Sequence, residues 1–299
     1  MNARAKYGFL AMLLIFALVG VARAEDEKVS IKLSLKQGQI FKLRLTTTNV
    51  GRATVGKTVV NNTESAVVGL VFSVESLDED GTAHLKVTFD RPSYSLSGTG
   101  QTGSDQVSAV VGSAFAALHG QSFSMELTPT GVVKSVTGLA GATSAALQTL
   151  SGKPQMVQMI ASLALKQAFA DAAWREAMSG VFSVIPPSPV AIGERWSRQF
   201  SVGGEGAAQS GESFMKILSR ENGVAKIKVF TNIKSLQRQP VPGMTINLTG
   251  TSDGVVSVEE ATGLIADGSD KSNLKGNGTA PDGKPFSLVA SSSNRIERY

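Results

Sequence analysis

Two short segments of the sequence have the residue spacing of known catalytic motifs. The first, Gly51–Thr58, fits the pattern G-x-x-x-x-G-K-[ST] that holds nucleotide phosphates. In a true phosphate loop a helix follows the glycines, so that the N–H groups of its first turn bind the phosphates. Val59–Thr63 follows here, and its β-branched and Asn residues disfavour a helix. We therefore predict a hairpin loop at this place and no nucleotide site.

The second segment, Gly250–Gly254, fits the G-x-S-x-G pattern of serine hydrolases. That motif exposes its serine at a sharp turn between a strand and a helix. Val255–Val258 reads as another strand instead, so we predict a β-turn around Asp253 and Gly254. A hydrolase that uses Ser252 or a carboxylate pair stays as a third hypothesis, which requires a base within hydrogen-bond reach of the serine.

Other residues that bind metals or activate nucleophiles are few. The chain has two histidines, His84 and His119, and no cysteine. Neither histidine has the spacing to further ligands that a metal site or a catalytic triad requires. The acidic segments Asp78–Asp80 and Asp267–Asp270 do not fit the calcium loop of an EF-hand. The sequence therefore predicts no catalytic residue, no metal and no cofactor, and a protein that is not an enzyme.

The N-terminus has the three parts of a secretory signal peptide. Arg4 and Lys6 precede an apolar run over 7–21, and Ala22-Arg23-Ala24 provides small residues for cleavage. We expect residues 1–24 to be removed after Ala24 and the mature chain to be exported to a bacterial periplasm or exterior; a retained signal anchor is the alternative. The lack of cysteine agrees with a bacterial rather than an animal secreted protein.

The charge of the mature chain excludes one class of partner. Cleavage removes three of the 29 Lys and Arg residues, which leaves 26 against 24 Asp and Glu. These charges are scattered, without a basic patch or interleaved aromatic residues on the predicted surface. We therefore expect no nucleic-acid partner, and no stable membrane span once the signal peptide is gone.

Most of the mature chain alternates between apolar and polar residues. Val29–Leu45 and Val67–Phe89 show this period of two, which is typical of half-buried antiparallel strands, and Asp80-Gly81 supplies a hairpin turn. The second half repeats the pattern from residue 193 onward, with a corresponding turn at Asn222-Gly223. Only residues 105–119 interrupt the first half, with helical spacing.

The central segment, residues 138–192, differs from its surroundings because Ala, Met and Leu residues favour helices. Met156, Met159, Ile160 and Leu163 fall near one face of such a helix. Such a face packs against a sheet in most proteins. The alternative is a cover over a hydrophobic groove, for which adaptable methionines are suited. Under that alternative the candidate ligand-binding residues are Met156, Met159, Ile160 and Leu163.

The two β halves have three ordered anchors in common. A glycine stands three residues before an aromatic at Gly38 and Gly193, a turn follows at Gly81 and Gly223, and a threonine-led turn follows at Thr128–Gly131 and Thr251–Gly254. Phe72 and Phe214 each stand nine residues before the second anchor's glycine. We therefore predict an internal duplication, although hairpins share turn residues by necessity.

These observations define the predicted organisation of the chain. The fold class is mainly β (α+β), with two related antiparallel sheets or half-barrels joined by a central helical segment. The predicted units are a signal peptide at 1–24, a first β unit at 25–137 with an inserted helix at 105–119, a helical linker at 138–192 and a second β unit at 193–299. Whether the β units form one domain or two stays open.

The passage between the halves resembles a family of secreted bacterial β-rich proteins that is defined only as a domain of unknown function. In that family a Pro-x-x-Pro-Val-x-x-Gly-x-x-Trp stretch leads into the second β half. Pro186, Pro189, Val190, Gly193 and Trp196 occupy those places here. The resemblance implies a β-rich fold and provides no catalytic residues.

We therefore expect an exported, non-catalytic protein. The first hypothesis is that it binds a hydrophobic or lipid-like molecule in a groove between sheet and helices. The alternative is a structural or protein-interaction component of the bacterial cell envelope, whose edge strands or loops contact an envelope protein.

Overall fold

The computed structural model describes residues 28–99, 104–204, 207–239 and 243–299. The predicted signal peptide, residues 1–24, lies outside the described residues. Among the described residues, no helix is both long enough and apolar enough to cross a membrane.

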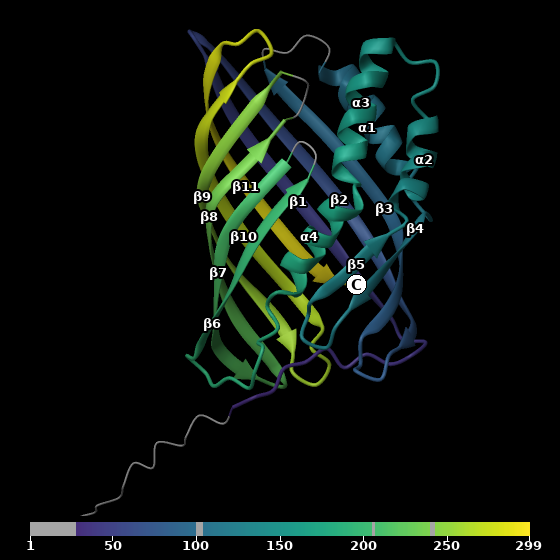
Figure 1. Cartoon of the computed structure of the whole chain (residues 1–299), viewed down its shortest axis with the longest axis vertical. Helices are drawn as coiled ribbons and strands as arrows, with labels where there is room; N and C mark the ends of the chain where they lie inside the picture. Colours follow the sequence, from purple (N-terminus) through teal and green to yellow (C-terminus); the bar gives the residue numbers. More distant parts are fainter. Residues whose placement is uncertain (1–27, 100–103, 205–206, 240–242) are drawn as a thin grey trace, which may run out of the picture.

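The described chain forms one antiparallel sheet of eleven strands, which curves strongly around the interior (Figure 1). The order across the sheet is β5-β4-β3-β2-β1-β11-β10-β9-β8-β7-β6. Neighbours in sequence therefore pair, except that β5 and β6 form the two edges of the sheet, and β1 pairs with β11. The strands are β1 (Ile40–Val55), β2 (Thr58–Leu77), β3 (Ala83–Thr99), β4 (Ser122–Leu127), β5 (Val133–Thr137), β6 (Arg195–Gly204), β7 (Ala207–Glu221), β8 (Val224–Arg238), β9 (Thr245–Glu259), β10 (Ile265–Thr279) and β11 (Pro285–Arg298).

The prediction of a mainly antiparallel β fold is confirmed, but the prediction of two sheets is wrong. Strands β1 and β11 pair from Leu43 opposite Arg298 to Thr54 opposite Ser287. This long ladder joins the two halves into one sheet. Turn residues in the sequence identify hairpins between neighbouring strands, whereas they contain no signal for a pairing between the two ends of the chain.

The segment that fits a phosphate loop is a β-hairpin. Gly56 and Lys57 form the turn between β1 and β2, and Gly56 has a φ of +58°, which glycine adopts without strain. The predicted turn at Asp253-Gly254 is wrong, because both residues lie within β9. A Cβ atom on Gly254 would meet Ser269 O and Asp270 Cβ at 2.5 Å, so glycine is required here for close strand approach rather than for a turn.

Four helices cover part of the concave face of the sheet (Figure 1). Helices α1–α3 pack over the β3–β4 side, and α4 lies between the two edge strands, β5 and β6. Helix α4 therefore closes the gap that an open curved sheet leaves between its edges. The helices are α1 (Ser104–Ala116), α2 (Leu139–Gln148), α3 (Gln155–Ala168) and α4 (Asp171–Phe182).

Most of the main core lies between these helices and the β1–β5 half of the sheet, and it extends onto β6–β10 through Trp196, Met215, Ile217, Ala225, Ile227, Val258 and Ile265. Phe72 stacks on Phe41 at 4.6 Å between ring centroids and meets Phe182, the last residue of α4, edge to face at 6.4 Å. A second aromatic group, in which Phe89 contacts Trp174 at 5.3 Å, holds the start of α4 on β3. Both ends of α4 are thus anchored by buried rings.

Candidate functional site

A cavity of about 760 Å³ lies between the C-terminal half of α4 and the concave face of the β6–β11 half of the sheet. Residues from Glu176 to Val184 form its helical wall, and β1 and β6–β11 form its floor and sides. The large apolar side chains of the core fill the other half of the interior, where α1–α3 pack. The cavity is therefore the part of the interior that no helix other than α4 covers among the described residues.

The floor of the cavity is layered, because residues that pair across neighbouring strands share one chemical character. Nearest the core lies an apolar row in which Val256, Ile296 and Leu45 follow one another through Gly268. Farther along the strands lies a polar row, whose members are each the register partner of the next: Ser213, Thr231, Ser252, Ser272, Ser292 and Asn49. We call this set the polar row. The first four line the cavity, and Ser292 and Asn49 continue the row beyond its described lining.

Beyond the polar row the interior becomes apolar again. Ile233, Leu236 and Leu248 form a second buried cluster, separate from the main core, with Leu274 and Leu288 packed against it. The interior of the β6–β11 half is therefore apolar at both ends and polar in the middle. Small Ser and Thr side chains in the middle occupy less volume than Leu or Ile would, and this explains why the centre stays hollow.

Asp270 of β10 lies next to the polar row and is half-buried. Its Oδ2 accepts hydrogen bonds from Ser252 Oγ at 2.8 Å and from Asn294 Nδ2 at 3.1 Å. No described group donates to its Oδ1. The site therefore presents one carboxylate oxygen that a bound molecule can use as an acceptor.

Ser252 is placed differently from the prediction. It lies within β9, lines the cavity and donates to Asp270, instead of standing on an exposed turn. A carboxylate is thus within hydrogen-bond reach of the serine. The two histidines of the chain, His84 and His119, are not among the residues that line the cavity.

The helical wall supplies most of the apolar surface near the core. Met178 and Val184 are almost fully buried, and Val181 packs partly against the core. Glu176 is the acidic residue of this wall, and its partial burial raises the pKa of its carboxyl group above the ordinary value. The wall thus adds a desolvated carboxyl group but no described cation to the cavity.

Arg198 of β6 fixes the edge of the sheet to the end of α4. Its Nη2 donates to Thr130 O at 2.8 Å and to Ile185 O at 2.9 Å. Burial lowers the pKa of Arg198, although an arginine remains charged at any ordinary pH. Gly131 has a φ of +77°, and a Cβ atom there would lie 2.3 Å from Phe182 O, so the β4–β5 turn also packs tightly on the end of α4.

The four residues predicted to bind ligand lie on α3, and none of the described side chains of α3 lines the cavity. Met159 is 59% exposed and Leu163 is half-buried, whereas the side chains of Met156 and Ile160 lie outside the described structure. The buried face of α3 consists of Val157, Ala161 and Leu165 instead. Ligand binding at the predicted face stays a prediction, and the cavity under α4 is a separate site.

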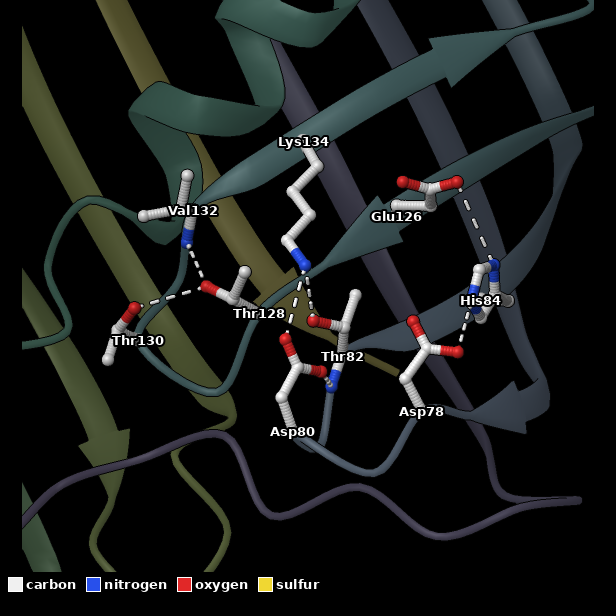
Figure 2. A network of polar contacts seen from close by, with 9 residues as sticks. All are labelled: Asp78, Asp80, Thr82, His84, Glu126, Thr128, Thr130, Val132 and Lys134. Atoms are coloured by element: carbon white, nitrogen blue, oxygen red, sulfur yellow. Dashed lines mark hydrogen bonds and ion pairs between the residues drawn. The ribbon is translucent and has the colours of Figure 1, made fainter.

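The other concentration of charged groups lies at the far end of the β2–β3 hairpin, where Figure 2 shows His84 between two acids. His84 Nε2 lies 2.9 Å from Asp78 Oδ1, and its Nδ1 lies 3.8 Å from Glu126 Oε1. These contacts join the hairpin turn to β4. In the described part of the chain no group of three or more His, Asp or Glu residues is placed to hold a metal ion.

Lys134 and Asp80 tie the same turn to β5 (Figure 2). Asp80 Oδ1 accepts the backbone N–H of Thr82 at 2.8 Å, and its Oδ2 lies 3.3 Å from Lys134 Nζ. The hydrogen bonds from Thr82 and Lys134 lower the pKa of Asp80 from 3.8 to about 2. The charged carboxylate is thus favoured in the folded state.

We expect the contribution of Asp80 to stability to disappear in acid. Because its folded pKa is depressed, the contribution is complete above pH 3.8 and is lost as the pH falls towards 2. Asp80→Asn keeps an acceptor for Thr82 but has no charge to lose. The difference in unfolding free energy between the wild type and this variant, measured by urea denaturation, should be constant above about pH 5 and shrink below pH 4. Parallel curves down to pH 2.5 would contradict this assignment.

Comparisons with known proteins match the fold only remotely. No curated protein matches the chain. Among solved structures, lipovitellin is similar at 9% identity with a TM-score of 0.47, over 89% of this chain and 25% of that one, so the chain spans a quarter of the lipovitellin chain. An outer membrane channel from Pseudomonas putida F1 is 8% identical with a TM-score of 0.27, over 89% of this chain and 97% of that one.

A DUF1329 family protein from Desulfovibrio piger ATCC 29098 is 9% identical with a TM-score of 0.14, over 83% of each chain. A family model also matches the chain. It covers residues 80–265, from the β2–β3 turn to the start of β10, and includes the passage from Pro186 to Trp196. Because this match spans more than half of the sequence, the chain belongs to DUF6263, a family of unknown function.

Proposed function

We propose that the protein binds a hydrophobic or amphipathic small molecule in the cavity under α4, without transforming it. The observation that carries this proposal is the cavity itself, a partly open space of about 760 Å³ between α4 and the curved sheet. Small-molecule sites in proteins have volumes of about 300–1,000 Å³ and are mainly apolar with a few polar groups. The apolar row, the polar row and Asp270 provide such a combination.

The arrangement of the helices supports this proposal. In the β1–β5 half, α1–α3 bury the concave face and complete a core. In the β6–β11 half the concave face carries Ser213, Thr231 and Ser252, which are too small and too polar to replace a covering helix. A lipid-like molecule seated there would cover the apolar row against Val181 and Val184 and remove this surface from water.

A binding role accounts for Ser252 better than a catalytic one. An aspartate alone is a weak base for a serine hydroxyl, and known serine hydrolases place a histidine between the two. The cavity has a Ser252–Asp270 contact without a lining histidine. We therefore infer that this pair fixes side-chain positions for binding and that the protein is not an enzyme.

We further propose that the protein acts outside the cytoplasm, after cleavage at Ala24. The support is the sequence of residues 4–24, with its basic start, apolar run and small residues before the cleavage point. A hydrophobic molecule in the periplasm or exterior is poorly soluble in water, and a protein cavity gives it an apolar environment.

One measurement tests both proposals, namely native mass spectrometry of the protein purified from its own host. The expected result is a species that consists of residues 25–299 plus a small molecule, which denaturing conditions release. A chain that retains residues 1–24 would contradict export with cleavage. A mature chain that carries no small molecule and associates with an envelope protein would instead favour the structural alternative.

The halves of the sheet also support the inference of a duplication. Gly38 and Gly193 have φ values of +78° and +85° just before β1 and β6, and Gly81 and Gly223 have values of +79° and +75° at the β2–β3 and β7–β8 turns. We infer that one copy gained the helices that fill it. The other copy kept an open concave face, and this face forms the cavity.

A further inference from the structure

We propose that the ligand of this cavity carries a protonated amine that binds Asp270, with its apolar part against α4. This inference rests on the proposed function, because it names the chemical class of the molecule in the same cavity. It follows from the position, partners and charge of the groups that line the floor.

Asp270 stands on the floor of the cavity, next to the polar row. It belongs to β10, which lies in the middle of the β6–β11 half, and it pairs with Gly254 on one side and Asn294 on the other. Gly254 and Asp270 both line the cavity, and their strands approach so closely that a Cβ atom on Gly254 would lie 2.5 Å from Asp270 Cβ. Because Gly254 has no side chain, a head group can reach Asp270 from the cavity without displacing a side chain at position 254.

The hydrogen bonds to Asp270 come from uncharged groups, so no described positive charge balances its carboxylate. Its Oδ2 accepts from Ser252 and Asn294, which are both uncharged donors, and its Oδ1 accepts from none of the described groups. No described Lys, Arg or His forms an ion pair with it. A half-buried carboxylate in this condition gains most from a ligand that brings a positive charge and N–H donors.

The other charged groups of the lining agree with a cationic ligand. Glu176 adds a second acidic group from the helical wall. Arg198 is already engaged with the carbonyl oxygens of Thr130 and Ile185, and Arg295 pairs with Glu297 at 2.9 Å. Two acids thus face the cavity, of which Glu176 has the charge of Arg175 near it and Asp270 has no described ion-pair partner, whereas both arginines have described acceptors.

The polar row supplies hydrogen-bond acceptors for the remaining N–H groups of such a head group. Ser252 and Ser272 lie on β9 and β10 opposite each other, and Ser213 Oγ lies 2.9 Å from Thr231 Oγ1 across β7 and β8. Hydroxyl oxygens accept hydrogen bonds as readily as they donate them. An ammonium at Asp270 has three donors, so one bonds the carboxylate and the others find hydroxyl oxygens of the row.

The test compares three ligands with the same chain and different head groups. Dodecylamine, dodecanol and dodecanoate are titrated into the purified mature protein below their micellar concentrations, and dissociation constants are measured by isothermal titration calorimetry at pH 7. We expect dodecylamine to bind at least about tenfold more tightly than dodecanol, because a hydrogen bond to a charged group adds about 1.5–3 kcal/mol and each 1.4 kcal/mol is tenfold. Dodecanoate should bind most weakly.

Asp270→Asn provides the second arm of the test, since it keeps the size of the side chain and removes its charge. This variant should lose the preference for dodecylamine over dodecanol, because its uncharged amide gives the ammonium no ion pair. Asp282→Asn is the matched control, because Asp282 is exposed at the β10–β11 turn, outside the cavity. It should leave all three dissociation constants unchanged.

The outcomes separate this inference from the proposed function. Tight binding of dodecanoate, weakened by Arg198→Met, would overturn the amine assignment in favour of an anionic ligand at Arg198 while leaving the binding function intact. Equal affinities for all three ligands in the wild type would also overturn it. Failure of every ligand to bind the folded protein would overturn the proposed function itself.

Discussion

Replacing Phe182 with alanine is expected to lower the free energy of unfolding by about 3–5 kcal/mol. Phe182 is 1% exposed and ends α4, where its ring meets Phe72 edge to face at 6.4 Å. Phe72 in turn stacks on Phe41 of β1. Truncation leaves a hole between the helix and the sheet and removes the aromatic contacts that hold the end of α4.

The measurement is urea denaturation of the wild type and the variant, monitored by circular dichroism. Phe214→Ala is the matched control, because Phe214 is 42% exposed on the outer face of β7 and should cost about 1 kcal/mol or less. Equal losses in the two variants would contradict the role of Phe182 as the anchor of α4. We also expect the Phe182 variant to lose affinity for dodecanol, since the wall of the cavity would no longer be fixed.

Much of the β structure could be predicted because the signal is local. A period of two identifies a strand with one buried face, and the pairs Asp80-Gly81 and Asn222-Gly223 identify turns that need a positive φ. Both turns are present, with φ values of +79° at Gly81 and +75° at Gly223. Local chemistry therefore decides where neighbouring strands begin and reverse.

Which face of each strand is buried could not be predicted, because differences of a single residue in register decide it. Phe72 and Phe214 stand at the same distance from their turn glycines, yet Phe72 is buried and Phe214 is exposed. Each hairpin has one register shift between the phenylalanine and the turn, so the turns decide the difference: residues 78–82 connect β2 to β3, whereas Asn222 and Gly223 alone connect β7 to β8. A difference of one residue in register moves a side chain to the opposite face.

The site was missed for a related reason. The apolar spacing of the helical segment predicts a binding face on α3. The cavity instead lies between α4 and strands that are rich in polar residues. β10 carries polar residues at nearly every position from Asp267 to Asn277. A strand with polar residues on both faces in the middle of a sheet is a usable signal, because it indicates that the interior there is not a packed apolar core.

Filling the cavity from α4 is expected to weaken ligand binding by at least about tenfold, or 1.4 kcal/mol. Gly180 lines the cavity, and a Cβ atom there meets no atom within 4 Å. Gly180→Trp therefore places a large ring beside the cavity without a backbone clash. Since glycine is about 1 kcal/mol less favourable than alanine inside a helix, the variant should be at least as stable as the wild type.

Gly141→Trp is the matched control for this substitution. Gly141 is an exposed glycine of α2, a Cβ atom there also meets nothing within 4 Å, and it does not line the cavity. Any general effect of a surface tryptophan on solubility or on helix stability should appear equally in both variants. A difference in ligand affinity between the two variants therefore measures the effect of filling the cavity.

Titration of dodecanol into the wild type, Gly180→Trp and Gly141→Trp tests the central claim most directly, because dodecanol has no charge and its binding does not require an ion pair with Asp270. The wild type and Gly141→Trp are expected to bind with the same dissociation constant, and Gly180→Trp at least about tenfold more weakly. Equal binding by all three folded proteins would contradict the claim that the cavity under α4 is the ligand site.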